Sequence, residues 1–349
     1  MPSRLAAVVM TLLLAAPVAA WQDLVVHIDD FADGTAAGVE AGDVVTLAGD
    51  GTGGFPRRGA WTSPVTAADP AAIEILPSWS VQTPPGTGVR LDLRVRLAET
   101  DEWSPWLDMG YWGEVPPPAT AESFEGGDVS VDILELDRPA DAWQIRATLV
   151  AYDLSSSPTL QRISVALRGG EPPVDHGTAD WSGDLDVPFL HQGSAGDLIG
   201  GSICSPTSVA MALAHFGIDV DLVTHAAETY DREHGIFGNW NRAVARANEL
   251  GAEAHLEFFD DWQSLADHLK AGRVVVASIR FKKGEAPSFV MNATAGHLIV
   301  LRGLTPDGNV IVNDGAHATE GEKAIYKKSE MEKAWFDNAG GVGYVIGAS

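Results

Sequence analysis

The sequence predicts a protein of two domains, an all-β domain built as a sandwich or jelly roll, followed by an α+β domain. Short apolar runs that alternate with polar residues fill residues 21–170, with turn residues between them. From residue 184 onward, apolar residues recur at helical spacing and strands follow the helices. About 330 residues follow a removable N-terminal segment, which is more than one core usually serves.

Residues 1–20 have the pattern of a secretory signal peptide. Arg4 supplies a positive start, an apolar stretch follows, and Val18 and Ala20 occupy the small-residue positions of a signal peptidase site. The apolar stretch is too short to span a bilayer comfortably. We therefore expect a mature chain that starts near Trp21 and is secreted, periplasmic or at the surface of a bacterial-type cell, without membrane insertion.

The front domain is predicted to be all-β over residues 21–170. In residues 89–97 apolar and polar side chains alternate with the period of a half-buried strand. No helical pattern of useful length occurs in this part, and the spacing of the runs fits an antiparallel sandwich or jelly roll. The runs are DLVVHI (23–28), DVVTLAG (43–49), VRLDLRVRLAE (89–99), DVSVDILEL (128–136), AWQIRATLVAYD (142–153) and LQRISVALRG (160–169).

Residues 171–183, which lack any periodicity, read as a linker, and residues 184–349 as the second domain. Three helices are expected over 205–217, 240–251 and 260–272, the last with Asp261 as its N-cap and Gly272 at its end. Strands are expected over 273–281, 297–304, 309–314 and 343–347, with a hairpin turn between the second and third. Helices followed by antiparallel strands indicate an α+β domain.

The composition excludes several classes of partner. A formal net charge of −25 repels nucleic acid and anionic membranes. With a single cysteine the chain cannot form an internal disulfide. The sequence has no His/Cys cluster at zinc spacing and no EF-hand loop, so it predicts no metal and no other cofactor.

Cys204, the only cysteine, lies at or near the start of a predicted helix, just before Pro206. Exposed amides and the helix dipole at such a position stabilise a thiolate, which is the reactive form of a nucleophile. A Gly-rich stretch before it lets backbone approach a substrate closely. Read alone, Cys204 is as well explained by a buried structural thiol.

A base and an orienting group are found further along the chain. His297 opens a strongly apolar strand, and the strand after the hairpin turn ends in Asn313 and Asp314. A hairpin brings the end of its second strand back beside the start of its first, so one of these two side chains should lie next to His297. Gln192 precedes Cys204 by twelve residues and could bind an oxyanion together with the Cys204 amide. Each element has a structural alternative, but the ordered set indicates nucleophilic catalysis.

These motifs resemble the C39-like peptidases, a group of papain-like cysteine peptidases. The resemblance covers residues 184–349 and is carried by VPFLHQ…CSPTSVAMALAHFG, GHLIVLRGL and DGNVIVNDG. It implies a papain-like fold with Cys204 as nucleophile, His297 as base, Asp314 as orienting residue and Gln192 in the oxyanion hole. Many members have glycine after the cysteine, whereas this chain has Ser205.

The sequence thus predicts a secreted cysteine peptidase that hydrolyses peptide bonds through an acyl-enzyme, with a peptide or protein as its partner. A cell-wall amidase or transamidase would use the same three groups, and a catalytically silent surface-binding module is a further alternative. Six of eleven tryptophans lie between residues 61 and 143 of the front domain. Their rings could stack on a cell-surface glycan, or they could simply pack a sheet.

Overall fold

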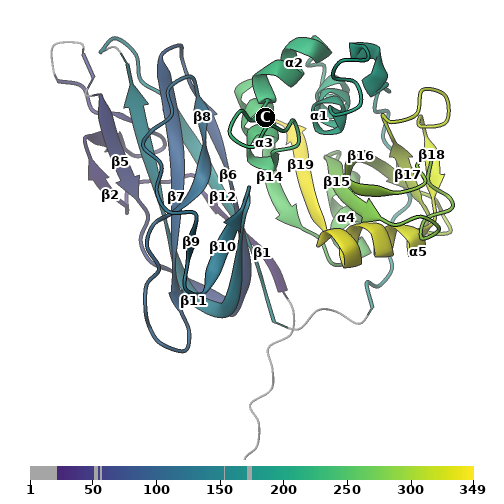
Figure 1. Ribbon diagram of the computed structural model, residues 1–349, viewed down its shortest axis with the longest axis horizontal. Coiled ribbons are helices and arrows are strands. Elements are labelled where there is room, and N and C mark those ends of the chain that lie inside the picture. Colours follow the sequence, from purple (N-terminus) through teal and green to yellow (C-terminus); the bar gives the residue numbers. More distant parts are fainter. Residues whose placement is uncertain (1–21, 51–53, 56, 153, 171–174) are drawn as a thin grey trace, which may run out of the picture.

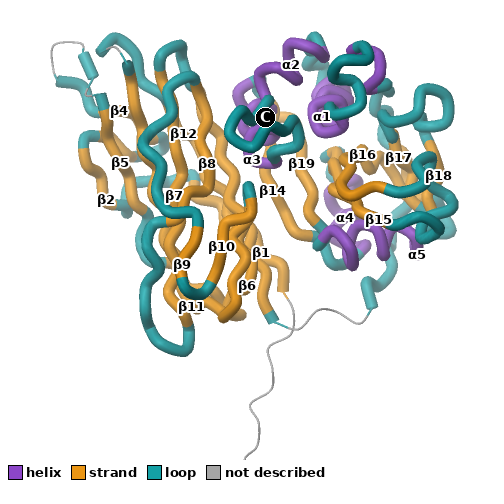
Figure 2. The backbone as a smooth tube through the Cα atoms, viewed as in Figure 1, coloured by secondary structure: helices purple, strands orange, loops and turns teal. Residues whose placement is uncertain are grey.

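The computed structural model describes residues 22–50, 54–55, 57–152, 154–170 and 175–349, which form two sheets side by side (Figure 1). The predicted signal peptide and residues 171–174 of the predicted linker lie outside the described residues. Figure 2 shows strands and loops in the front part of the chain, whereas the helices gather around the second sheet. The two-domain organisation is confirmed, and we keep the predicted boundaries, 21–170 and 184–349, as a proposal.

Among the described residues of the front domain, hydrogen bonds join twelve strands into one sheet. The strands are β1 Gln22–Ile28, β2 Thr35–Ala37, β3 Val39–Ala41, β4 Val45–Leu47, β5 Arg58–Thr62, β6 Thr66–Gln82, β7 Thr87–Leu97, β8 Leu107–Gly113, β9 Ser123–Phe124, β10 Gly127–Ser130, β11 Ile133–Ala151 and β12 Thr159–Gly169.

The long strand β11 is the reason that these strands form one sheet. Its first part pairs with β6 and β10, and its second part pairs with β5 and β7. The all-β class is therefore as predicted, but the hydrogen bonding is that of one curved sheet rather than the two separate sheets of a sandwich or jelly roll. Apolar side chains from most of these strands share one core.

The run 128–136, predicted as one strand, is two strands joined by a tight turn. β10 ends at Ser130, and β11 starts at Ile133 and pairs back onto β10. Val131 has a φ of 60° in this turn, a conformation that a β-branched residue rarely adopts. The alternating pattern hid the break because Val129, Val131 and Ile133 continue the period of two through the turn.

The second domain places helices around a sheet in the order β14-β19-β15-β16-β17-β18, with β13 on β16. Neighbouring strands of this sheet pair antiparallel. Its strands are β13 Gly183–Asp184, β14 Ala252–Phe258, β15 Val274–Phe281, β16 Thr294–Leu304, β17 Val310–Asn313, β18 Ala324–Tyr326 and β19 Val342–Ala348. Its helices are α1 Cys204–His215, α2 Leu222–Thr229, α3 Trp240–Glu249, α4 Trp262–Lys270 and α5 Lys328–Met331, with a 3-10 turn at Gln192–Ala195 and a π-helical turn at Glu332–Asp337.

The three predicted helices and four predicted strands of this domain are present, and Asp261 caps α4 by accepting from the Ser264 amide at 2.8 Å. The sequence analysis missed α2, β14 and β18. Helix α2 has only eight residues, and β18 has only three, so neither spans enough turns or pleats to show a period.

The front domain packs on α3 and β14, whereas β17 and β18 lie at the opposite end of the second sheet (Figure 1). Leu76, Ile133 and Ala166 of the front domain belong to the same buried apolar cluster as side chains of α1, α3 and β14. Polar contacts cross the same boundary, including a bond from the Asn248 Nδ2 to the Trp79 carbonyl at 3.2 Å. The two domains are therefore joined by a continuous apolar contact as well as by the chain.

Candidate active site

Cys204 is the first residue of α1 and has a half-buried thiol. The first turn of α1 contains Pro206 and no acidic residue, so nothing in that turn offsets the positive end of the helix dipole. The side chains from Ser205 to Leu213 are buried, which fixes the helix against the sheet. The predicted position of the cysteine at a helix start is what the structure has.

His297 lies on β16, which starts at Thr294, three residues earlier than predicted. Both backbone polar groups of Leu298, the next residue, interact with side chains of α1. Its N–H is directed at the Cys204 sulfur, and its carbonyl accepts from the Ser208 hydroxyl at 3.0 Å. Because Ser208 is one turn beyond Cys204, these contacts fix the strand that carries the histidine against the helix that carries the cysteine.

Asp314 directly follows β17 and accepts a bond from His297 Nε2 at 2.7 Å. Register explains this contact, since Asn313 pairs with Val300 and the hairpin brings the end of β17 toward the start of β16. Asn313 points away, because successive side chains of a strand face opposite sides. Its Nδ2 donates to the Val187 carbonyl at 3.0 Å. Of the two candidates that the sequence left open by geometry, Asp314 is the one beside the imidazole.

Tyr326, which the sequence analysis did not single out, donates to the second oxygen of Asp314 at 2.7 Å. Its side chain is fully buried and stacks on Phe289, with ring centroids 3.9 Å apart. The Ala316 amide adds a third bond to the carboxylate at 3.0 Å. Asp314 thus has bonded partners on both oxygens. A signal for Tyr326 existed only in the pairing of β18 with β17, which the sequence does not reveal.

Gln192 opens the 3-10 turn and is held at both its backbone and its side chain. Its N–H donates to the Gly315 carbonyl at 2.9 Å, next to Asp314. Its Nε2 donates to the Gly200 carbonyl at 2.8 Å, four residues before Cys204. A side-chain amide has two N–H bonds, so one is left for another acceptor. Its Oε1 is buried and has no partner among the described protein groups.

The pKa of the Cys204 thiol is lowered and the pKa of the His297 imidazole is raised, so each group favours its charged form. Burial acts to raise the pKa of Cys204, but the hydrogen bond and charge of His297, with amides of Leu298 and Ser205, outweigh it and lower the pKa from 9.0. Burial likewise disfavours a charged His297, yet its bonds to Asp314 and Cys204 raise its pKa to about 10. The arrangement therefore favours a thiolate–imidazolium pair at neutral pH.

Ser205 lies at the position where many members of the resembled family have glycine, and its side chain points into the protein interior. Its side chain is fully buried, and its hydroxyl lies 3.1 Å from the hydroxyl of Tyr344 on β19. The serine side chain is therefore turned into the core. It leaves the backbone amide of residue 205 directed at the Cys204 sulfur.

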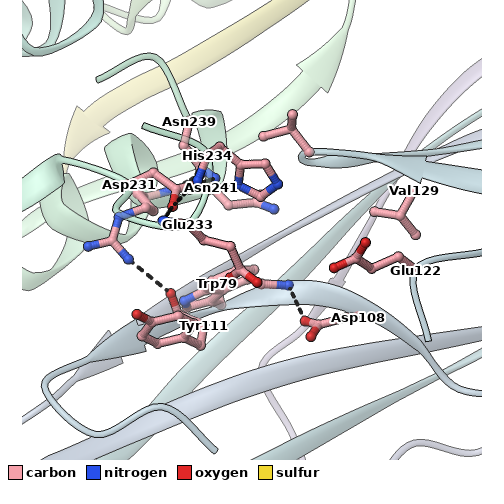
Figure 3. A pocket seen from close by; sticks show the side chains of 13 residues that line it. Trp79, Asp108, Tyr111, Glu122, Val129, Asp231, Glu233, His234, Asn239 and Asn241 are labelled. Atoms are coloured by element: carbon pink, nitrogen blue, oxygen red, sulfur yellow. Dashed lines mark hydrogen bonds and ion pairs between the residues drawn. The ribbon is translucent and has the colours of Figure 1, made fainter. Parts of the chain in front are cut away.

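A second polar region is a cavity of about 60 Å³ between the domains (Figure 3). Asp108 and Glu122 come from the front domain, and Glu233 and His234 come from the segment between α2 and α3. Three buried polar atoms in and around it have no partner among the described residues: Trp79 Nε1, Asn241 Oδ1 and Asp132 Oδ1. Sequence reasoning did not find this cavity, because it depends on how the two domains meet.

The tryptophans of the front domain mostly pack the protein interior. Trp61, Trp79 and Trp143 are 0 or 1 % exposed, and Trp112 is 5 % exposed. The rings of Trp103 and Trp106 are more accessible. The Arg94 guanidinium lies over both, with its Cζ atom 4.8 and 4.7 Å from the ring centroids. These positions favour the packing interpretation over glycan stacking.

In the part of the chain that the structure describes, we find no helix long and apolar enough to cross a membrane. The same residues contain no group of three or more His, Cys, Asp or Glu side chains arranged to hold a metal ion.

Comparisons with known proteins relate both parts of the chain to C39 peptidases. Residues 184–342 match the Peptidase C39 like family, and residues 22–167 match the Peptidase C39 N-terminal domain. No curated protein gives a match. One similar solved structure is a C39-like peptidase from Bacillus anthracis, with 20% identity over 49% of this chain and 100% of that chain, at a TM-score of 0.37.

Another similar structure is a double glycine motif protease from an AMS/PCAT transporter in complex with the leader peptide. It has 16% identity over 48% of this chain and 95% of that chain, at a TM-score of 0.30. We base the assignment on the two family matches, which follow each other in the order of the two sheets. Residues 184–342 thus belong to the C39-like peptidase family, and residues 22–167 in front of them match a C39 N-terminal domain.

Proposed function

We propose that this chain is a secreted cysteine peptidase with a papain-like peptidase domain, and that Cys204, His297 and Asp314 form its catalytic triad. The single observation that carries the proposal is the alignment of these three groups. The thiol contacts the imidazole, and the other ring nitrogen donates to a buried carboxylate at 2.7 Å. A structural cysteine needs no such chain of partners.

The reaction starts from the thiolate of Cys204. Its sulfur forms a bond to the carbonyl carbon of the substrate, and the carbonyl electrons move onto oxygen. When the carbon–nitrogen bond breaks, the leaving amine takes the proton of the His297 imidazolium. His297 then accepts a proton from the water that attacks the thioester. The carbon–sulfur bond breaks, the carboxylic acid leaves, and the thiolate–imidazolium pair is restored. Asp314 keeps the imidazole in one orientation and stabilises its positive charge.

The oxyanion is bound by the backbone N–H of Cys204 and the side-chain amide of Gln192. The position of Gln192 supports this role, because its Nε2 is held beside residue 200 with one N–H left to donate. The Ser205 side chain, buried against Tyr344, does not compete for this space.

The substrate is a peptide or protein outside the cytoplasm, since the N-terminal 20 residues have a signal-peptide pattern. A cell-wall amidase or transamidase would use the same acyl-enzyme and differ only in the amide that is attacked or in the acceptor. Among the features described above, none favours carbohydrate binding by the front domain, so we do not make it part of the proposal.

The test uses the mature chain, residues 21–349, with peptide libraries, casein and cell-wall fragments assayed side by side, with and without an added amine. We expect peptide hydrolysis that Cys204→Ala and His297→Ala abolish. His215→Ala is the matched control, because His215 lies at the other end of α1 and bonds the Asp186 carbonyl rather than a group of the proposed triad. Hydrolysis that survives Cys204→Ala would contradict the triad, and cleavage of cell-wall fragments alone would make the chain an amidase.

The state of the thiol is tested without any substrate, by the rate of Cys204 alkylation with iodoacetamide against pH. We expect fast labelling well below the free-thiol pKa of about 8.5. His297→Ala should return the pH dependence to that of an ordinary thiol. Slow labelling with an unchanged profile in the variant would identify a structural cysteine and a silent domain.

A further inference from the structure

Tyr326 contacts two parts of the peptidase domain that are far apart in the sequence. Its hydroxyl donates to Asp314 Oδ2 at 2.7 Å and accepts from the backbone N–H of Val290 at 3.2 Å. Val290 belongs to the segment between β15 and β16, residues 282–293. One buried hydroxyl therefore links that segment to the carboxylate that orients the histidine.

The segment 282–293 is itself fastened close to Tyr326. Phe289 stacks on the Tyr326 ring with an interplanar angle of 10°. The Glu330 carboxylate accepts from both the amide and the hydroxyl of Ser288, at 2.7 and 2.6 Å. The Lys327 amide in turn donates to the Ser288 hydroxyl at 3.0 Å. These bonds hold the hydroxyl of Tyr326 in one place, so it can define the plane of the Asp314 carboxylate.

We propose that Tyr326 is a positioning residue of the peptidase site, which holds Asp314 so that its Oδ1 faces His297 and Cys204. This inference rests on the proposed function and adds a residue to it. A hydrogen bond to a buried charged group is stronger than one between neutral groups, and removing the donor leaves a carboxylate oxygen without a partner. The carboxylate could then rotate or take up a proton.

The proposal predicts a change in pH dependence. The titratable groups that face Asp314 are His297 from β16, with Cys204 of α1 behind it, and Tyr326 from β18. Burial acts to raise the pKa of Asp314, and the bonds from His297, Tyr326 and the Ala316 amide reverse this and lower it. Without the Tyr326 hydroxyl, Asp314 should become protonated at a higher pH. The imidazolium would then lose its partner, and activity would be lost earlier as pH falls.

The test compares Tyr326→Phe with Phe289→Leu in the mature chain. The first variant removes only the hydroxyl and keeps the ring that stacks on Phe289; the second disturbs the stacking and keeps the hydroxyl. The readouts are the pH profiles of kcat/KM and of Cys204 alkylation, with thermal unfolding as a check on folding. Tyr152→Phe is the matched control, because Tyr152 is 77% exposed in the front domain.

For Tyr326→Phe we expect kcat/KM to fall about tenfold at neutral pH through kcat, and the acid limb to move up by roughly one pH unit. Phe289→Leu should lower the unfolding temperature and leave the acid limb where it is. An unmoved acid limb in Tyr326→Phe, or the same movement in both variants, would overturn the inference. The alkylation profile gives this answer even if no peptide is cleaved, so a failed inference is distinguishable from a failed proposal of function.

Discussion

Two buried aspartates, Asp314 in the candidate active site and Asp132 at the contact between the domains, have opposite ionisation behaviour. Asp314 is 1 % exposed and Asp132 is 3 % exposed. Asp314 has partners on both oxygens, and its pKa is lowered despite burial. Asp132 accepts from the Trp240 amide at 2.8 Å through one oxygen, and its other oxygen has no partner among the described residues. Burial raises its pKa to about 7.

The comparison teaches that burial sets only the starting point for these carboxylates, and that their bonded partners decide the outcome. At Asp314 a histidine, a tyrosine and a backbone amide together outweigh desolvation. At Asp132 the start of α3 supplies amide bonds, but neighbouring Asp231 adds a like charge. Asp314 is thus kept ionised beside a histidine, whereas Asp132 is only partly ionised near neutral pH.

The largest effect is expected from removing Cys204, the proposed nucleophile beside His297 and Asp314. Cys204→Ala should lower kcat/KM at least about 10⁴-fold, because neither His297 nor Asp314 can form an acyl-enzyme without the sulfur. Steady-state peptide hydrolysis measures this. The protein should stay folded by circular dichroism, so that the loss is assigned to chemistry. A residual rate near that of the wild type would remove the proposed role of the whole region.

The same substitution in the two regions sharpens the comparison. Asp314→Asn should lower kcat/KM roughly 10²- to 10³-fold, because His297 loses the charge that supports its imidazolium. The alkaline limb, expected near the His297 pKa of about 10, should move to lower pH. Asp132→Asn should keep kcat/KM within about twofold of the wild type and leave the alkaline limb where it is. Equal losses in the two variants would mean that Asp314 acts through general stability.

A smaller loss is expected for Gln192→Ala, since the backbone amide of Cys204 would still bind the oxyanion. We expect kcat/KM to fall about 10- to 100-fold, with the pH limbs unchanged. Gln192→Glu is the informative second variant, because a negative charge in place of the amide donor should cost more than its removal. A rate unaffected by either variant would take Gln192 out of the oxyanion hole.

The smallest effect on activity, but a measurable effect on stability, is expected for Asp132→Asn. The folded-state pKa of Asp132, about 7, lies above its ordinary value of 3.8, so its contribution to stability is fully present below pH 4 and is lost as pH rises through 7. The gap corresponds to at most about 4 kcal/mol at pH 8. Asparagine does not ionise, so the variant should gain stability relative to the wild type between pH 5 and pH 8. Denaturant unfolding of the variant and the wild type at these two pH values measures the difference in their unfolding free energies. A difference that is the same at both pH values would contradict the raised pKa.

Much of the candidate active site could be predicted because its signals are local. Pro206 and the apolar spacing after it locate the start of α1, and the hairpin brings Asp314 back to His297. The choice between Asn313 and Asp314 follows from the alternation of side chains along a strand, once the register is known. The proposed catalytic set was therefore within reach of sequence reasoning.

What could not be predicted depends on contacts between distant segments. Tyr326 lies on a strand of three residues, and its partners Asp314 and Val290 are 12 and 36 residues away. The residues of the turn at Val131 continue the alternation of apolar and polar side chains, so the break between β10 and β11 is hidden. The cavity beside Asp132 exists only where the two domains meet. The periodicity of a single segment does not predict contacts between distant segments.

The docking of the front domain onto β14 has a consequence for the solubility of the peptidase domain. β14 is the last strand of its sheet, and its outer side would otherwise offer unpaired backbone groups to another chain. The front domain covers this strand, and Ser78 accepts the Leu256 N–H at 3.1 Å. A fragment of residues 184–349 would therefore expose an edge that invites aggregation. We expect that the two domains must be expressed together, and that a cut between them leaves them associated.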